Sequence, residues 1–327
     1  MKKVFHCIAI FYFCSHMNFA AAQKSTDTNL NVAKLNLATD LLDQYSGEQA
    51  SLEQARLELE SVLKSNPRSA PAHREMARYF IMRGHMSYQN FQTDALEKAD
   101  SSIKKAIEIN PKFAEAYVLR GHLYRLMKRR GDAIIALEKA ERIGTTDPWL
   151  QMNWADLLLD EEKYEDAAAR YKNVLGSKTT NKKVRISAFE GLIRVYENVN
   201  DLDRADETYH RLLAFDPAGA WSYGNYAQFL LCEKDDYESA IGRAREALSI
   251  MNYGAGRHWL ASALYRKWAQ HVLAGEPTKG EGAFQEAKTL ADPFDVVARV
   301  RDCPPLSSVT IALGRNNIFR DIAPPKR

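Results

Sequence analysis

The sequence is poor in the patterns from which catalytic and metal sites are built. Its four cysteines and eight histidines are scattered, and no two histidines after residue 22 have the i, i+4 spacing of a helical metal site. A His-Glu-x-x-His motif, a glycine-rich phosphate loop and a Gly-x-Ser-x-Gly elbow are all missing. We therefore expect no enzyme, no metal and no cofactor. An enzyme that processes or transfers carbohydrate is the least favoured alternative.

A strong excess of charge of one sign is also missing. The 45 Lys and Arg residues nearly balance the 42 Asp and Glu residues, which leaves a formal net charge of +3. A nucleic-acid-binding protein usually carries a basic patch or stripe, so we expect no nucleic-acid partner. The hydrophobic fraction of 46% and the charged fraction of 27% are typical of a folded protein.

Long hydrophobic runs are absent except at the start of the chain. Lys2 and Lys3 precede an apolar run, residues 4–14, and Ala20–Ala22 then provide small residues. This order is typical of a secretory signal peptide, because the run is shorter than the roughly 18 residues that span a membrane. We predict a signal peptide over 1–22, cleaved before Gln23, and an exported, periplasmic or secreted chain without an integral membrane segment. An uncleaved N-terminal anchor is the alternative.

Signal removal would leave two cysteines, Cys232 and Cys303. An oxidising compartment permits a disulfide between them, but a bridge requires Cα atoms within about 7 Å. The sequence leaves open whether they pair or remain two separate thiols.

Small and large apolar residues recur in a regular order along the chain. Ala155 and Ile193 occupy matching positions 38 residues apart (193 minus 155). The recurring sets are Gly121, Tyr124, Ala133 and Ala140; Ala155, Leu158, Ala167 and Val174; and Ile193, Tyr196, Ala205 and Leu212. Such a period predicts stacked helical hairpins, each of which needs its neighbours to bury its apolar face.

Prolines mark where several of these helices should end or begin. A helix over Gln49–Ser65 should stop at Asn66-Pro67, because proline cannot continue the hydrogen-bond ladder. The same reasoning predicts that helices end at Asn110-Pro111, Asp216-Pro217 and Asp292-Pro293, and that one begins at Asp147-Pro148.

Over about residues 49–293, the chain resembles the tetratricopeptide repeat family, a helix–turn–helix of 34 residues. The unit that matches best carries Tyr117, Gly121, Tyr124, Ala133, Leu137 and Ala140. The resemblance implies an all-α, right-handed superhelical solenoid of about six to seven hairpins; an irregular helical bundle is the alternative. Longer connections around 85–94, 177–183 and 275–282 are either functional or neutral insertions.

Four segments follow from these predictions. A signal peptide occupies 1–22, a lead segment with one helix 23–48, and the repeat array 49–293. The last segment, 294–327, is expected to be a capping segment with an extended tail. Within the tail, Val309, Ile311 and Leu313 alternate like a short strand.

The resemblance further implies that the first helix of each hairpin lines a concave groove that binds peptides. The groove candidates are Arg74, Arg78, His122, Arg125, Trp149, Met152, Asp156, Glu190, Arg194, Glu197, Trp221, Gln228 and Trp259. For the three tryptophans, packing between hairpins is the alternative. The Lys and Asn clamp of co-chaperone members is not reproduced at these positions.

We therefore expect an exported scaffold that binds another protein or an extended peptide. Arginine–carboxylate and aromatic contacts would set its specificity. The alternative is a structural subunit of an envelope or secretion assembly that associates with itself.

Overall fold

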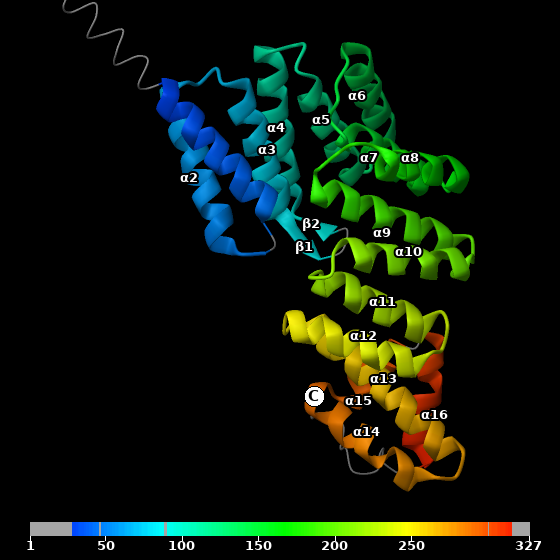
Figure 1. Ribbon diagram of the computed structural model, residues 1–327. Coiled ribbons are helices and arrows are strands. Elements are labelled where there is room, and N and C mark those ends of the chain that lie inside the picture. The colour runs from blue at the N-terminus through cyan, green and yellow to red at the C-terminus, as the bar shows by residue number, and fades with distance from the viewer. Residues whose placement is uncertain (1–27, 46, 88–89, 300, 316–327) are drawn as a thin grey trace, which may run out of the picture. The chain divides into compact units, whose positions relative to one another are not determined.

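A computed structural model describes residues 28–45, 47–87, 90–299 and 301–315 (Figure 1). The predicted signal peptide lies outside the described residues, as does the end of the predicted tail. Helices account for most of the described chain, which confirms the all-α fold class. The chain divides into two compact units, residues 1–161 and 162–327.

Unit 1 begins with helical residues 28–44. It continues with α2 (Gln49–Ser65), α3 (Ala70–Gly84), β1 (His85–Ser87), β2 (Asn90–Phe91), α4 (Thr93–Ile109), α5 (Ala114–Leu126), α6 (Arg130–Ile143) and α7 (Trp149–Asp160). The helix over 28–44 shares a core with α2, in which Ala38, Leu42, Ala55 and Leu59 are fully buried. Helix pairing therefore begins before Gln49.

The described residues of unit 2 form successive helices, the last of which follows a short 3₁₀ turn (Figure 1). Its elements are α8 (Tyr164–Gly176), α9 (Lys182–Asn198), α10 (Leu202–Phe215), α11 (Ala220–Cys232), α12 (Tyr237–Ile250), α13 (Gly254–Leu273), α14 (Pro277–Leu290), α15 (Pro293–Val297), η1 (Pro304–Leu306) and α16 (Ser307–Arg315). Three hairpins follow one another here: α9–α10, α11–α12 and α13–α14.

The helix ends follow the local chemistry that the sequence indicated. α2, α4 and α10 end two residues before their prolines and α14 ends three residues before Pro293, as predicted, and α7 begins directly after Pro148. Side chains at several starts accept a hydrogen bond from a backbone amide of the first turn, which satisfies a donor that the helix leaves unpaired. Asn181 accepts from the Val184 amide at 3.1 Å, and Asp236 from the Ser239 amide at 3.0 Å.

A left-handed residue after the first helix of a hairpin recurs with the repeat. Lys128, Glu162, Asn200 and Asp235 have φ of 57°, 59°, 56° and 53°. In three of these turns the next amide bonds back to the first helix: Arg129 donates to the Tyr124 carbonyl and Asp201 to the Tyr196 carbonyl, both at 2.8 Å, and Asp236 donates to the Leu230 carbonyl at 2.9 Å. This helix-ending motif reverses the chain sharply, so the repeat is visible in the backbone as well as in the sequence.

Small residues set the spacing between paired helices, as the repeat predicted. Ala133 and Ala140 are fully buried, and a methyl group added at Gly121 would lie 2.4 Å from Cδ2 of Leu137. Neither helix could approach the other so closely with a larger residue at these positions.

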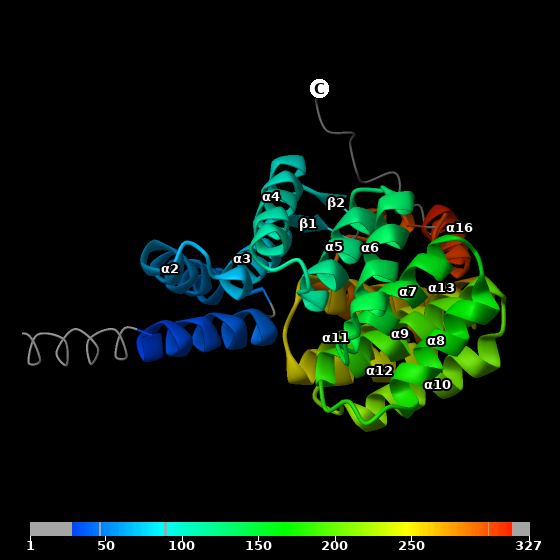
Figure 2. The ribbon, with the colours of Figure 1, turned by 90° about the horizontal axis from the view of Figure 1, so that it is seen from above.

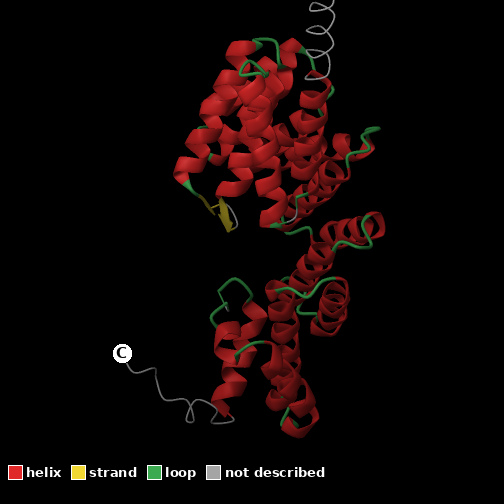
Figure 3. Ribbon diagram, turned by 90° about the vertical axis from the view of Figure 1, so that its left-hand side faces the viewer, coloured by secondary structure: helices red, strands yellow, loops and turns green. Residues whose placement is uncertain are grey.

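The insertion after α3 forms a small exception to the helical fold. β1 and β2 pair antiparallel between α3 and α4 (yellow in Figure 3). The Gln92 amide donates to the Gly84 carbonyl at 2.9 Å, and this hydrogen bond joins the two ends of the insertion. A methyl group on Gly84 would lie 2.4 Å from Cβ of Ala95. The end of α3 and the start of α4 therefore approach each other closely despite the insertion between them.

Two predictions near the C-terminus are wrong. The segment 275–282 is not a loop, because α14 already begins at Pro277, which suits the first turn of a helix. The predicted strand is the helix α16, in which Val309, Ala312 and Leu313 are fully buried at i, i+3 and i+4 while Ile311 is 52% exposed. The sequence alternation was real, but the burial follows the helical period.

The segment between α15 and η1 carries a disulfide. Cys303 is joined to Cys232 at the end of α11, with Cα atoms 4.6 Å apart. Of the two alternatives that the sequence left open, the structure contains the bridge.

Candidate functional site

The arginines of α3 that were expected to receive a ligand carboxylate are engaged within unit 1. Both guanidinium groups contact the Glu75 carboxylate, which is 3% exposed; Arg78 Nη1 lies 2.7 Å from Glu75 Oε2. Arg78 also pairs with Asp43 of the helix over 28–44. Removing one member of such a buried network leaves its partners charged and unpaired. Arg78 therefore links α3 to the helix over 28–44, and a ligand would have to compete with Glu75 for either arginine.

A second ion network links α5 to α7. Arg125 Nη2 lies 3.2 Å from Asp156 Oδ2, and Nη1 lies 3.1 Å from Asp160 Oδ2. His122, one turn earlier, has its pKa lowered to about 4, mainly by burial and further by the positive charge of Arg125, while Asp156 opposes the shift. The imidazole is therefore neutral near pH 7, and the charge of Arg125 is largely compensated by the two carboxylates.

Three groove candidates take part in packing. Met152 and Trp259 are only 2% and 8% exposed, so their prediction as ligand contacts is corrected. Trp149 is half-buried and packs against the cluster that contains Val118 and Leu137. The first-helix period placed these residues correctly on an inward face, but neighbouring helices cover that face.

In unit 2, one face of α9 carries three charged side chains. Glu190, Arg194 and Glu197 follow at i, i+4 and i+7 and therefore share one face of the helix. The Tyr209 hydroxyl of α10 donates to Glu197 Oε1 at 3.4 Å. Burial raises the pKa of Glu197 to about 7, and the nearby Glu233 adds to this effect, while Tyr209 and Arg194 oppose it. Glu197 is therefore poised between its two protonation states near neutral pH.

The raised pKa of Glu197 predicts a pH-dependent substitution effect. Because the unfolded carboxyl ionises near 4.5, the folded protein binds the proton more tightly, and stability falls as pH rises from about 4.5 through about 7. Glu197→Gln should therefore raise the melting temperature at pH 8.5 by a few degrees and leave it nearly unchanged at pH 4.5. Thermal melts at both pH values measure the difference. Glu190→Gln, the same substitution two turns earlier on the same face of α9, is the control. An equal gain for Glu197→Gln at both pH values would contradict the assignment.

The first helix of the next hairpin, α11, carries an exposed aromatic surface. Trp221 is 53% exposed, and its ring centroid lies 4.4 Å from that of Tyr253. The Tyr253 hydroxyl donates to the Ala220 carbonyl at 3.0 Å and occupies the space above Gly224, where an added methyl group would lie 2.1 Å from it. Gln228, two turns after Trp221, is exposed on the same side. We call Trp221, Tyr253 and Gln228 the α11 surface.

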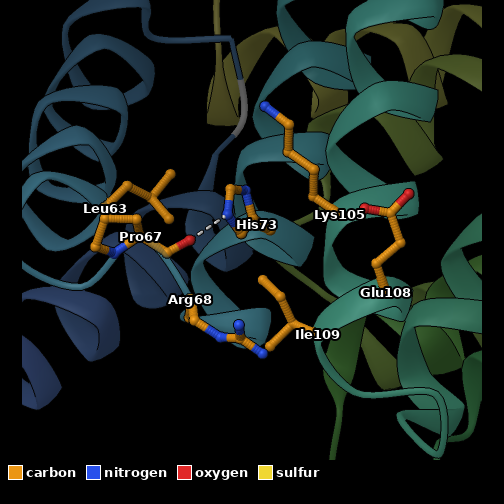
Figure 4. Close-up of a pocket in the computed structure, with 7 residues that line it drawn as sticks. All are labelled: Leu63, Pro67, Arg68, His73, Lys105, Glu108 and Ile109. Atoms are coloured by element: carbon orange, nitrogen blue, oxygen red, sulfur yellow. Dashed lines mark hydrogen bonds between the residues drawn. The ribbon is translucent and has the colours of Figure 1, made fainter.

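Unit 1 also contains a pocket of about 420 Å³ between α2, α3 and α4 (Figure 4). Leu63, Pro67, Arg68, His73, Lys105, Glu108 and Ile109 line it. The His73 ring nitrogen is bound to the Pro67 carbonyl at 2.9 Å, and the lining offers no hydroxyl or thiol that the imidazole could activate. A hollow of about 340 Å³ along α5 and α6 contains Lys139, 34 residues after Lys105 (139 minus 105).

Metal and membrane chemistry find no support in the part of the chain that the structure describes. Those residues contain no group of three or more His, Cys, Asp or Glu side chains that could hold a metal ion. Every described helix is too short or too polar to cross a bilayer.

Sequence reasoning missed the partners that define these surfaces. Asp43, Tyr209, Glu233 and Tyr253 were not among the candidates, although each contacts or shifts one that was. Asp43 precedes the predicted repeat array, Tyr209 lies on a second helix, α10, and Tyr253 lies in a connection with no periodic signal. Only Glu233, adjacent to α11, could have been found from the repeat phase.

Sequence comparisons find similarity over part of the chain. A model of the tetratricopeptide repeat matches residues 114–143, which include α5 and α6. The human protein O-mannosyl-transferase TMTC3 is 29% identical over 149 residues, which are 45% of this chain and 16% of that protein. This chain therefore corresponds to a small part of that relative.

Solved structures share the fold at low sequence identity. The APC/C Cut9–Hcn1 structure aligns with a TM-score of 0.55 at 18% identity, over 72% of this chain and 46% of that one. The pilus biogenesis factor PilW aligns with a TM-score of 0.52 at 18% identity, over 68% of this chain and 94% of that one. The Thermus thermophilus protein TTC0263 aligns with a TM-score of 0.51 at 20% identity, over 62% of this chain and 99% of that one. The chain thus has the all-α fold of the tetratricopeptide repeat proteins, and its α5–α6 hairpin is recognised as a member of that repeat family.

Proposed function

We propose that this protein is an exported scaffold that binds another protein or an extended peptide through the first helices of its hairpins. The observation that carries the proposal is the α11 surface, where a tryptophan that is 53% exposed stands beside an exposed glutamine on a rigid helix. Aromatic residues are enriched where binding energy concentrates. Export rests on the signal-like sequence of residues 1–22.

The charges described above change the expected mode of binding. Since Arg74, Arg78 and Arg125 are paired with internal carboxylates, a partner gains little from an acidic group placed near them. Binding should instead depend on burial of the Trp221 ring and on hydrogen bonds from the Gln228 amide. The affinity should accordingly respond weakly to salt, because screening acts mainly on exposed charges.

Affinity capture from a cell-envelope fraction tests the proposal. The double change Trp221→Ala and Gln228→Ala should reduce the captured partner at least tenfold, while circular dichroism and melting temperature stay near those of the wild type. Ile135→Ala is the control, because Ile135 is also a large apolar residue with more than half of its surface exposed, and it lies in unit 1. Retention of every partner by the double variant would refute the proposed surface.

Two further readouts separate the remaining parts of the proposal. N-terminal sequencing of the exported chain should begin at Gln23; a chain found only in the cytosol would refute export. A mass that rises with concentration, with no partner captured, would favour the self-associating subunit instead.

A further inference from the structure

Residues 303–315 lie on the first helices of the last two hairpins of unit 2. η1 contacts both α11 and α13, and α16 packs along α13, as two views show (Figure 1 and Figure 2). Leu306, Val309, Ala312 and Leu313 are fully buried there. Together with the disulfide to Cys232, these contacts hold the segment against α11 and α13.

The segment covers one end of a face whose other end is open. On α11, Trp221, Gln228 and Cys232 are seven and eleven residues apart, which places them within about 20° of one direction around the helix. The Trp221 end is exposed, whereas Cys232 is 7% exposed beneath Cys303. The α11 surface therefore continues directly into the surface that residues 303–315 occupy.

The placement differs from that of a simple end cap. A cap covers the last hairpin of an array, but η1 reaches back across α13 to the preceding hairpin. Among the described residues, the main packing partners of η1 and α16 are α11, α13 and α15, and the second helices α12 and α14 are not among them. With nine residues, α16 is too short to be stable as an isolated helix, so the surface beneath it holds it in shape.

The residues of the segment indicate which kind of ligand this surface fits. No charged residue lies between Asp302 and Arg315, and the buried stripe consists of aliphatic and small side chains at helical spacing. A complementary ligand is therefore a short, uncharged amphipathic helix that inserts its apolar face, a known mode of peptide recognition.

We propose that residues 303–315 are a built-in ligand of unit 2: they occupy the Cys232 end of α11 and α13, where a short, uncharged amphipathic helix of a partner protein binds after displacing them. This inference rests on the proposed function and adds the partner's chemistry and a means of control. With the disulfide closed, only the Trp221 end is open. A dithiol reduces the bridge to the Cys232 and Cys303 thiols and is itself oxidised to a disulfide; with the segment then displaced, the binding surface extends over both helices.

Disulfide trapping on the full mature chain tests the proposal. The variant Cys303→Ala/Val309→Asp/Leu313→Asp frees the surface and leaves Cys232 as the reporter. The probe is a synthetic peptide of residues 301–315 whose cysteine is activated as the mixed disulfide with thionitrobenzoate. The Cys232 thiolate attacks the peptide sulfur, a protein–peptide disulfide forms, and thionitrobenzoate leaves and is measured by its absorbance. The control peptide has a scrambled sequence with the cysteine in its original position.

We expect the native-sequence peptide to trap Cys232 at least tenfold faster than the scrambled peptide. The single variant Cys303→Ala, which keeps the apolar contacts, should show the same preference at a lower rate, because its own segment competes with the peptide. If the triple variant does not fold, the rates measured with this single variant test the proposal. Equal rates for the two peptides would overturn the proposal. So would dimerisation of the triple variant that excludes the peptide, since the occupant would then be a second copy. Loss of partner capture in Trp221→Ala/Gln228→Ala tests the proposed function separately, and it can hold even when the trapping fails.

Discussion

Replacing both Cys232 and Cys303 by alanine should lower the free energy of unfolding of unit 2 by about 4 kcal/mol, the chain-entropy estimate for a cross-link of this span. The bridge joins residues 71 apart in sequence, so its removal gives the unfolded chain much more freedom. Both sulfurs are buried, which adds lost packing to the entropic effect. Urea unfolding, followed by hydrogen exchange of amides in α11 and α13, measures the change.

A reductant provides the matched control for this prediction. Wild-type protein in excess dithiothreitol should lose nearly the same stability, and the double variant should be insensitive to the reductant. Amides of α2 and α4, in unit 1, should be unaffected in every sample. Equal urea midpoints for the oxidised wild type and the variant would show that the bridge contributes nothing to the folded state.

The sequence predicted the hairpins well because their determinants are local. A proline ends a helix whatever surrounds it, so the stops after α2, α4 and α10 were placed correctly. Small residues such as Ala133 and Ala205 lie where two helices touch, and both are fully buried. The period of the small residues and the positions of the prolines were therefore together sufficient to predict the fold class.

The binding surface was less predictable because it depends on contacts distant in sequence. Met152 and Gln228 were both assigned to the inward face of a first helix, yet one is buried and the other exposed. The difference depends on how far neighbouring helices cover each position, which no periodicity encodes. Likewise, Asp43 neutralises Arg78 from 35 residues away, and α16 is helical because α13 buries every third or fourth residue of it.

A tight contact between α8 and α9 gives the second large prediction. Gly191 of α9 faces the ring of Tyr171 on α8, and a methyl group added to it would lie 2.3 Å from Cε1 and Cζ of that ring. Tyr171 is fully buried, so the ring has no free space into which it could move. Gly191→Ala should therefore destabilise the protein by about 2 kcal/mol, since overpacking costs roughly 1–3 kcal/mol and exceeds the gain in helix propensity.

A matched glycine separates packing from propensity in this experiment. Gly242, inside α12 of the same unit, has no atom within 4 Å of an added methyl group, so Gly242→Ala should stabilise by about 0.5–1 kcal/mol. Urea unfolding should thus give opposite signs for the same substitution. In a Tyr171→Leu background, Gly191→Ala should cost much less, because the rigid ring is gone, whereas Tyr171→Phe should give no relief, since both clashing carbons remain. An undiminished cost in the leucine background would place the strain at the backbone of α9 and not at its contact with α8.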